Sequence, residues 1–213
     1  MNSIAENIRA IRGRMAAAAE AAGRDPGEIL LVGASKMNGA EACRAAIAGG
    51  IDALGENRVQ EMTEKLARNA YEGAPLHFIG HLQRNKVRQV VGTVSLIHSV
   101  GSWPLLEVNV GGEESKSGFA PEAVYEAAER AKALENIRVR GLMTIPPIQR
   151  EPHGNLPFFA KIARLYVDIS RNLYDNEFTY LSMGMSDDFE DAIAAGATVV
   201  RVGSAIFGHR QYH

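Results

Sequence analysis

The sequence predicts one α/β domain folded as a (β/α)8 barrel of the TIM type. Short apolar segments alternate with amphipathic segments of helical period along all 213 residues. This alternation gives eight strands separated by helices and leaves no stretch for a second domain. The main competitor, a doubly wound open sheet, has a glycine-rich phosphate loop after its first strand. Here the first strand ends in the segment ASKMN (34–38), so the barrel is favoured.

An amphipathic helix at 4–22 comes first and is additional to the barrel pattern. Ile8, Ile11 and Met15 recur on one face of it, and Gly23 ends it. The run ILLVGAS at 29–35 is too short for a core helix and too apolar for a half-exposed strand. It therefore indicates a strand buried on both faces. The remaining strands are predicted at 52–55, 76–80, 95–98, 105–110, 137–144, 179–183 and 198–202.

Helices are predicted between most of these strands. Pro121 takes the first position of one helix, where its missing N–H costs nothing. In another, Phe159, Ile162 and Ile169 lie on one face. The predicted helices span 39–48, 59–69, 85–91, 121–134, 156–173 and 188–195.

The alternation breaks between the fourth and fifth strands, where only residues 101–104 stand in place of a helix. A parallel crossover needs a dozen or more residues. A four-residue linker reaches at most roughly 18 Å, with nothing left to cross a face of the sheet. Either these strands are not parallel neighbours, or the sequence lacks a segment near Ser102 and Trp103. We favour the missing segment, about one helix plus a loop.

The composition excludes several classes of protein. Lys and Arg number 23 against 25 Asp and Glu, a net charge of −2, whereas a sequence-independent nucleic-acid binder needs a basic surface. No apolar run approaches the roughly 20 residues that span a bilayer, and the polar N-terminus is unlike a secretory signal. The single cysteine, Cys43, excludes an intramolecular disulfide and is expected to be a buried thiol. We expect a soluble cytoplasmic protein with no nucleic-acid or membrane partner.

The functional residues of a barrel lie where its strands end. Lys36 directly follows the first strand, and partial burial there would lower the pKa of the amine and let it form a Schiff base. Ser186 precedes a short helix, and Gly203 and Ser204 follow the eighth strand, where phosphate sites of barrels commonly lie. Together these residues indicate a ligand that has a carbonyl group for the lysine and a phosphate ester for the serines and glycine. Pyridoxal 5′-phosphate (PLP) has both groups.

Two weaker motifs have plainer interpretations. His77 and His81 could share a strand face as metal ligands, but no third ligand is apparent, so no metal site is predicted. The basic run at 83–88 is more typical of a solvated helix face than of a nucleic-acid site.

Eight motifs along the chain resemble the pyridoxal phosphate homeostasis protein family. That resemblance implies the barrel of fold-type III PLP enzymes, as in the N-terminal domain of alanine racemase. The chain departs from the family pattern at 101–104, where the family has a full helix and the start of the next strand. The motifs are VGASK (32–36), GENRVQE (55–61), HFIGHLQRNK (77–86), IHS (97–99), VNVGGEESKSG (108–118), RGLMTIP (140–146), LSMGMSDD (181–188) and VRVGSAIFG (200–208).

The resemblance also implies roles for particular residues. Lys36 is similar to the Schiff-base lysine, and Arg201 to the residue that faces the pyridine nitrogen. A guanidinium disfavours a second positive charge on that nitrogen, which makes the cofactor a weaker electron sink. The other implied cofactor-binding residues are Ser186, Gly203 and Ser204 at the phosphate and Asn57, His81, Met143 and Met183 around the ring.

Two functions are compatible with this resemblance. Racemisation by two bases needs a second acid/base opposite the lysine. The racemase relatives supply it as a tyrosine of the partner subunit's β-domain. This chain ends at His213, and none of its six tyrosines follows a strand. We therefore predict a PLP-binding homeostasis protein, monomeric and without robust catalysis or catalytic residues, with apo-enzymes that need PLP as recipients. A PLP-dependent amino-acid racemase is the alternative.

Overall fold

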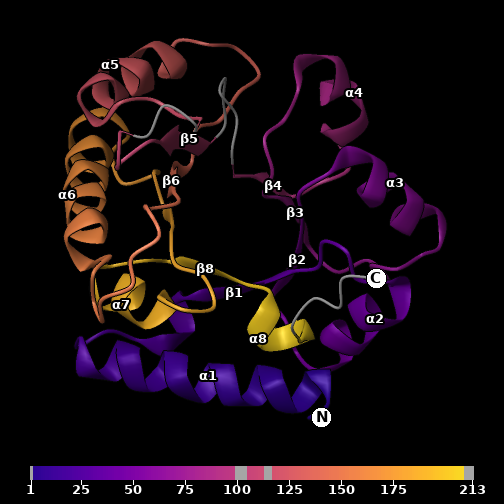
Figure 1. Ribbon diagram of the computed structural model, residues 1–213. Coiled ribbons are helices and arrows are strands. Elements are labelled where there is room, and N and C mark those ends of the chain that lie inside the picture. The colour runs from indigo at the N-terminus through magenta and orange to yellow at the C-terminus, as the bar shows by residue number, and fades with distance from the viewer. Residues whose placement is uncertain (1, 99–104, 113–116, 209–213) are drawn as a thin grey trace.

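The computed structural model describes residues 2–98, 105–112 and 117–208. Its eight strands are all parallel and form one sheet that curls round a central axis, with helices on the outside (Figure 1). The predicted α/β barrel fold is confirmed. The strands are β1 (Leu30–Ala34), β2 (Ala53–Glu56), β3 (Leu76–Phe78), β4 (Leu96–Ile97), β5 (Leu105–Val108), β6 (Gly141–Thr144), β7 (Tyr180–Ser182) and β8 (Val199–Val202).

The helices follow the predicted order with small differences at their ends. The basic segment predicted as one helix at 85–91 is a 3₁₀ turn followed by a single helical turn, and a short helix after β8 was not predicted. Elements of three or four residues are too short to show a helical period. The helices are α1 (Ile4–Ala21), α2 (Ala40–Ala48), α3 (Val59–Ala67), α4 (Val87–Val90), α5 (Pro121–Lys132), α6 (Leu156–Leu173), α7 (Phe189–Ala194) and α8 (Ser204–Phe207), with 3₁₀ turns at Pro26–Glu28 and Arg84–Lys86.

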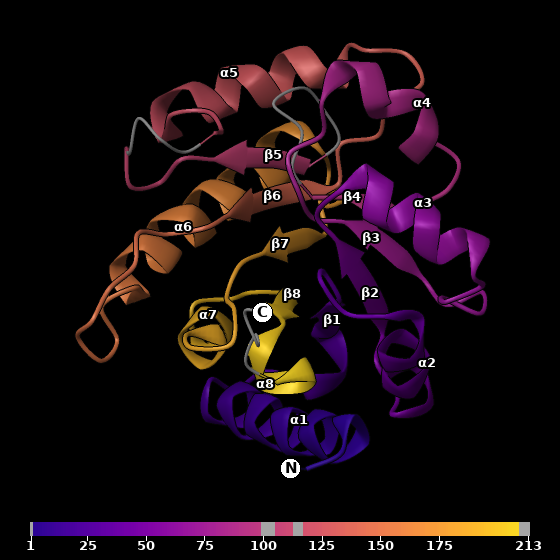
Figure 2. The same ribbon diagram turned by 45° about the vertical axis from the view of Figure 1, so that its right-hand side comes forward.

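The additional N-terminal helix α1 covers the β1–β8 side of the barrel and packs against α2, α7 and α8 (Figure 1 and Figure 2). It begins with a capping box, in which the Ser3 hydroxyl accepts from the Glu6 amide and the Glu6 carboxylate accepts from the Ser3 amide. Arg14 forms a two-point ion pair with Glu190 of α7. Within the described residues, no helix is long and apolar enough to cross a membrane.

Successive strand residues face two different environments, as the pleat requires. Leu31 and Val200 belong to the large core between sheet and helices, whereas their neighbours Val32 and Val199 pack together inside the barrel. Cys43 is fully buried on α2, as predicted. The interior is not wholly apolar, however, because its buried residues include several polar side chains from β3 to β8: His77, His98, Glu107, Ser182 and Arg201.

The sheet has two ends, β4 and β5, which do not pair with each other in the described residues. The segment predicted to be missing near 101–104 lies outside these residues. A cavity of about 1200 Å³ lies beside β4, lined by α4, by the segment before β6 and by Tyr180. The strand predicted at 137–144 begins only at Gly141, which pairs with Leu105, the first described residue of β5.

Candidate functional site at the carboxyl ends of the strands

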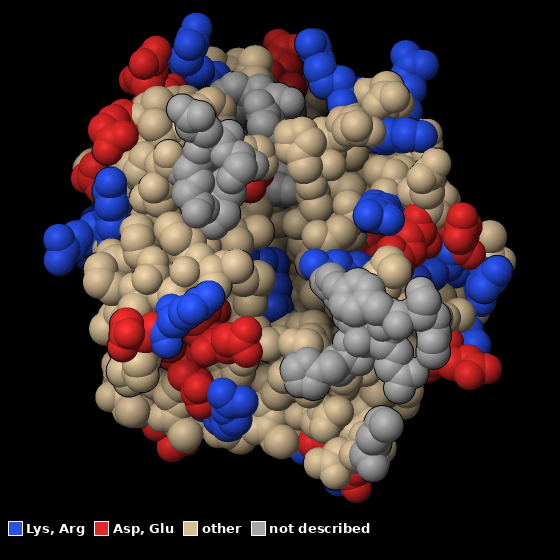
Figure 3. Space-filling model, viewed as in Figure 1, with Lys and Arg blue, Asp and Glu red and all other residues tan. Residues whose placement is uncertain are grey.

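Lys36 lies in the turn directly after β1 and is half-buried. It lines a cavity of about 470 Å³ at the carboxyl ends of β1, β2 and β3. Asn57, after β2, and His81, after β3, line the same cavity, so the fold brings together three of the predicted cofactor-binding residues. Figure 3 shows the molecule hollowed near the middle of one face, with basic side chains at the hollow.

The three residues predicted to bind phosphate also meet. The Ser186 hydroxyl accepts from the Ser204 hydroxyl at 3.1 Å and from the amides of Gly203 and Ala205, both at 3.4 Å. Ser204 is the first residue of α8, so two backbone N–H groups and two hydroxyls converge at the start of this helix. Such a donor set suits the oxygens of a phosphate group.

The phosphate-type cluster lies beside the strand that ends at Lys36. A Cβ atom built on Gly203 would stand 3.4 Å from the Cβ of Ala34, two residues before the lysine. The arrangement follows from the sheet, since β1 pairs with β8 and their carboxyl ends are adjacent. The amine and the phosphate donors therefore come from neighbouring strands, as a ligand with both an aldehyde and a phosphate requires.

Arg201 points into the barrel interior and is almost fully buried. Its guanidinium donates to the Ser182 hydroxyl at 2.5 Å and to the Thr144 carbonyl at 3.0 Å. Burial lowers the pKa of Arg201 to about 10, while the charges of Asp188 and Glu107 act in the opposite direction. The side chain is therefore a cation at neutral pH, and three strands fix its direction.

Sequence reasoning missed a hydrogen-bonded chain that continues from Arg201 across the interior. Ser182 lies 2.8 Å from Nδ1 of His98, and Nε2 of His98 lies 2.9 Å from Nδ1 of His77. Burial lowers the pKa of His77 to about 4 and that of His98 well below its ordinary value, so both rings are neutral at pH 7. A polar residue at an inward position of an apolar strand was the signal that could have revealed this chain.

Glu107 of β5 is a further buried group that the sequence analysis did not select. Burial raises the pKa of this carboxyl, and the Ser117 hydroxyl, which donates to it at 3.3 Å, partly offsets the effect. His77, considered above as a metal ligand, bonds to His98 instead, while His81 is exposed at the mouth. The described residues contain no group of three or more His, Cys, Asp or Glu placed to hold a metal ion.

The two predicted methionines occupy different places from the other site residues. Met143 is fully buried inside the barrel with Leu96. Met183 is fully buried in the large core between sheet and helices, because Ser182 before it faces inward and the next residue must face outward. Met183 therefore packs with core residues and does not lie with the residues at the mouth.

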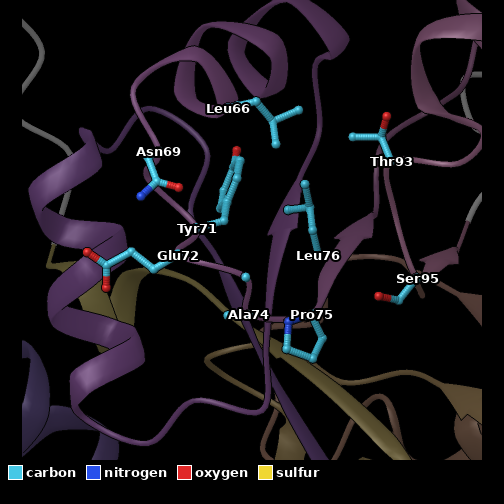
Figure 4. A pocket seen from close by; sticks show the side chains of 10 residues that line it. Leu66, Asn69, Tyr71, Glu72, Ala74, Pro75, Leu76, Thr93 and Ser95 are labelled. Carbon is cyan, nitrogen blue, oxygen red and sulfur yellow. The ribbon is translucent and has the colours of Figure 1, made fainter.

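A second cavity, of about 340 Å³, lies at the opposite end of the barrel (Figure 4). Its lining includes Leu76, where β3 begins, and Ser95, just before β4. Residues at this amino-terminal end of barrel strands generally serve stability, not chemistry. Tyr71 is also part of the lining of this cavity, and its side chain is buried.

The residues at the mouth fit PLP. The buried Oδ1 atom of Asn57 has no hydrogen-bond partner among the described residues, which leaves an acceptor for a polar ligand group. The Ser186 cluster supplies phosphate donors and Lys36 a primary amine. Among the described tyrosines none follows a strand; Tyr180 begins β7.

Comparisons with known proteins show the family of this chain. The family model of the alanine racemase N-terminal domain matches residues 1–211. The pyridoxal phosphate homeostasis protein of Pseudomonas aeruginosa is 43% identical over 230 residues, covering all of this chain and 98% of that protein. The protein of the same name from Aquifex aeolicus is 40% identical, with 97% of this chain and 98% of that protein covered. The first alignment spans 230 residues against 213 in this chain, so that relative has residues without a counterpart here.

Solved structures give the same result. PipY of Synechococcus elongatus, solved with PLP bound, superposes with a TM-score of 0.80 at 30% identity over 97% of this chain and all of that chain. Alanine racemase of Corynebacterium glutamicum superposes with a TM-score of 0.65 at 15% identity, over 94% of this chain and 60% of that one, which shows a shared fold alone. On the family match and the close relatives, this chain belongs to the pyridoxal phosphate homeostasis protein family, whose barrel is that of the alanine racemase N-terminal domain.

Proposed function

We propose that this chain binds PLP, holds it as a Schiff base on Lys36 and takes part in PLP homeostasis without robust catalytic turnover. The observation that supports this most directly is the position of Lys36 beside the Ser186–Gly203–Ser204 cluster, at the adjacent ends of β1 and β8. The names of the relatives and the PLP bound to PipY agree with it.

Each site residue then has a physical task. When bound, PLP would supply an aldehyde, a group that condenses with a primary amine with loss of water, and Lys36 would supply that amine. Ser186, Ser204 and the Gly203 amide hold the phosphate. Asn57 presents its free acceptor to the ring region.

The proposed role of Arg201 is to disfavour protonation of the pyridine nitrogen of bound PLP. Its cationic guanidinium, fixed by Ser182 and Thr144, opposes protonation of a ring nitrogen placed next to it. An unprotonated pyridine ring withdraws electrons less strongly than a protonated one, so PLP held beside Arg201 would be a weaker electron sink. This property favours storage and release of PLP over amino-acid chemistry.

The test is to load the purified protein with PLP and incubate it with L- and D-alanine and other amino acids. We expect the visible absorbance of bound PLP to appear and the optical rotation to stay constant. Racemase-type turnover on the order of 1 s⁻¹ or more would contradict the proposal and favour the alternative enzyme. The low identity to alanine racemases supports only a common fold, so that alternative has less support.

The phosphate cluster gives a separate prediction. Ser186→Ala removes the hydroxyl on which three donors converge, and one hydrogen bond to a charged group contributes about 1.5–3 kcal/mol. We expect PLP to bind about tenfold more weakly or worse, measured by equilibrium titration of the visible absorbance.

The matched control for this prediction is Ser3→Ala. It removes the cap of α1 and costs about 1 kcal/mol of stability, but the Ser3 hydroxyl bonds to the Glu6 amide and not to the Ser186 cluster, so PLP affinity should not change. An unchanged affinity of the Ser186→Ala protein would remove Ser186 from the phosphate site.

We also propose that the protein is a monomer, that it acts in the cytoplasm and that it passes PLP to apo-enzymes. Its single, buried, free thiol is typical of a reducing compartment such as the cytoplasm, which supports that part of the proposal. Sedimentation of the PLP-loaded protein at the mass of one chain, 23.0 kDa, is the expected result.

A further inference from the structure

The backbone on both sides of Lys36 is held by two side chains of α3. Nζ of Lys65 donates to the Ser35 carbonyl at 2.8 Å, and the Glu61 carboxylate accepts from the Met37 amide at 2.5 Å. Lys65 and Glu61 also pair with each other at 2.8 Å, one turn apart on the helix. We propose that Glu61 and Lys65 are positioning residues that fix the direction of Lys36 toward the aldehyde; this role rests on the proposed function.

The conformation of Met37 shows why the contact with Glu61 is needed. Its φ is +64°, in the left-handed region that costs a non-glycine residue about 1 kcal/mol or more. Its side chain is 72% exposed, so packing contributes little to holding the turn. The bond from the Met37 amide to Glu61 therefore stabilises this strained residue, together with two bonds within the turn, from the Asn38 amide to the Ser35 carbonyl and from Nδ2 of Asn38 to the Lys36 carbonyl.

Lys65 is itself held in a fixed place. Its side chain is only 8% exposed, and Nζ contacts Glu56 at 2.7 Å in addition to Glu61. Burial opposes the charged form of Lys65, but its hydrogen bonds to the two carboxylates outweigh this and raise its pKa. The Ser35 hydroxyl donates to Glu56 at 2.5 Å, which ties the end of β1 to the same group.

A buried tyrosine, Tyr71, lies near the carboxylate of Glu56. Burial raises the pKa of Tyr71, and the charge of Glu56 adds to the effect. Tyr71 is therefore a neutral phenol, and its buried side chain lies close enough to Glu56 to be affected by the charge of that carboxylate. Glu56 is fully buried and Lys65 nearly so, whereas Glu61 is partly exposed. The ion pair of Glu56 and Lys65 is therefore shielded from water, and in such surroundings a charge pair has a rigid geometry.

These contacts have a direct consequence for the reaction of Lys36. An amine held in a near-attack direction loses less conformational entropy when it forms a covalent bond. If the turn were free, the same amine would sample many directions, and PLP capture would be slower and weaker. Neither Glu61 nor Lys65 needs to touch the reacting atoms for this effect.

The test compares three variants of α3. Glu61→Ala removes the acceptor for the Met37 amide, Glu61→Gln restores an acceptor oxygen, and Glu64→Ala removes an exposed carboxylate on the same helix. Glu61 is partly exposed, so its loss spares the core. Two quantities are measured: hydrogen exchange of the Met37 amide in the protein without PLP, and the rate of PLP capture from the rise of its visible absorbance.

In the Glu61→Ala protein we expect about tenfold faster exchange of the Met37 amide and about tenfold slower PLP capture. Glu61→Gln should recover most of both, and Glu64→Ala should match the wild type. Unchanged exchange in Glu61→Ala overturns the proposed contact, and faster exchange with unchanged capture overturns the positioning role. A wild-type protein that captures no PLP overturns the proposed function instead, and the positioning role with it, whatever the exchange shows.

Discussion

Replacing Lys36 with alanine is expected to abolish covalent capture of PLP. The visible band of the bound cofactor should disappear, and borohydride reduction should leave no labelled peptide, because Lys36 is the amine at the mouth that lies beside the phosphate donors. The side chain is half-exposed, so the free energy of unfolding should change by about 0.5 kcal/mol or less.

The control for this experiment is Lys161→Ala, which removes an exposed lysine of α6 that pairs with Glu122. It should be labelled like the wild type, with the modified peptide still mapping to Lys36. A reducible band that persists in the Lys36→Ala protein would place the Schiff base on another residue.

The second large effect is a loss of stability on acidification. The pKa of His77 is lowered by burial from 6.5 to about 4 in the folded state. The unfolded chain therefore binds the proton first as the pH falls, so stability is fully present above about pH 6.5 and declines from there to about pH 4. Between pH 7 and pH 5 this one group should cost about 2 kcal/mol. His98, whose pKa is lowered further, acts in the same direction.

Urea unfolding at pH 7 and pH 5 measures this effect. His77→Gln keeps a polar side chain but cannot titrate, so the difference between the two pH values should shrink by about 2 kcal/mol. Val91→Ala, which replaces an exposed side chain that carries no charge, should keep the wild-type difference. Equal pH dependence in the His77→Gln and wild-type proteins would show that the buried chain does not resist protonation.

The structure has the predicted fold, and it brings several of the predicted site residues together, for a physical reason. Apolar runs with two buried faces define parallel strands, and parallel strands in a barrel place all their carboxyl ends at one mouth. Lys36 and Ser204 could therefore be placed at the same mouth from their positions after the first and eighth strands. The contact between Ser186 and Ser204 follows from the same rule.

Other features of the structure are contacts between residues far apart in the sequence, which no local sequence pattern predicts. In the sequence, Lys65 is an ordinary lysine of a predicted helix. In the structure it is buried, and its Nζ donates to the carbonyl of Ser35, thirty positions earlier. The chain from His77 to Arg201 joins four strands whose order round the axis decides which side chains meet. Met183, for which the family resemblance implies a place around the ring, belongs to the large core between sheet and helices.

The sequence by itself determined the barrel and the position of a lysine and of small polar residues at its mouth, since each depends on the local period and on the end of a strand. Only the tertiary structure decided the interior hydrogen bonds, the contacts of Glu61 and Lys65 and the unpaired edges of β4 and β5 among the described residues. Such contacts depend on which elements become neighbours when the sheet curls, and burial then sets the charge states of the groups that meet there.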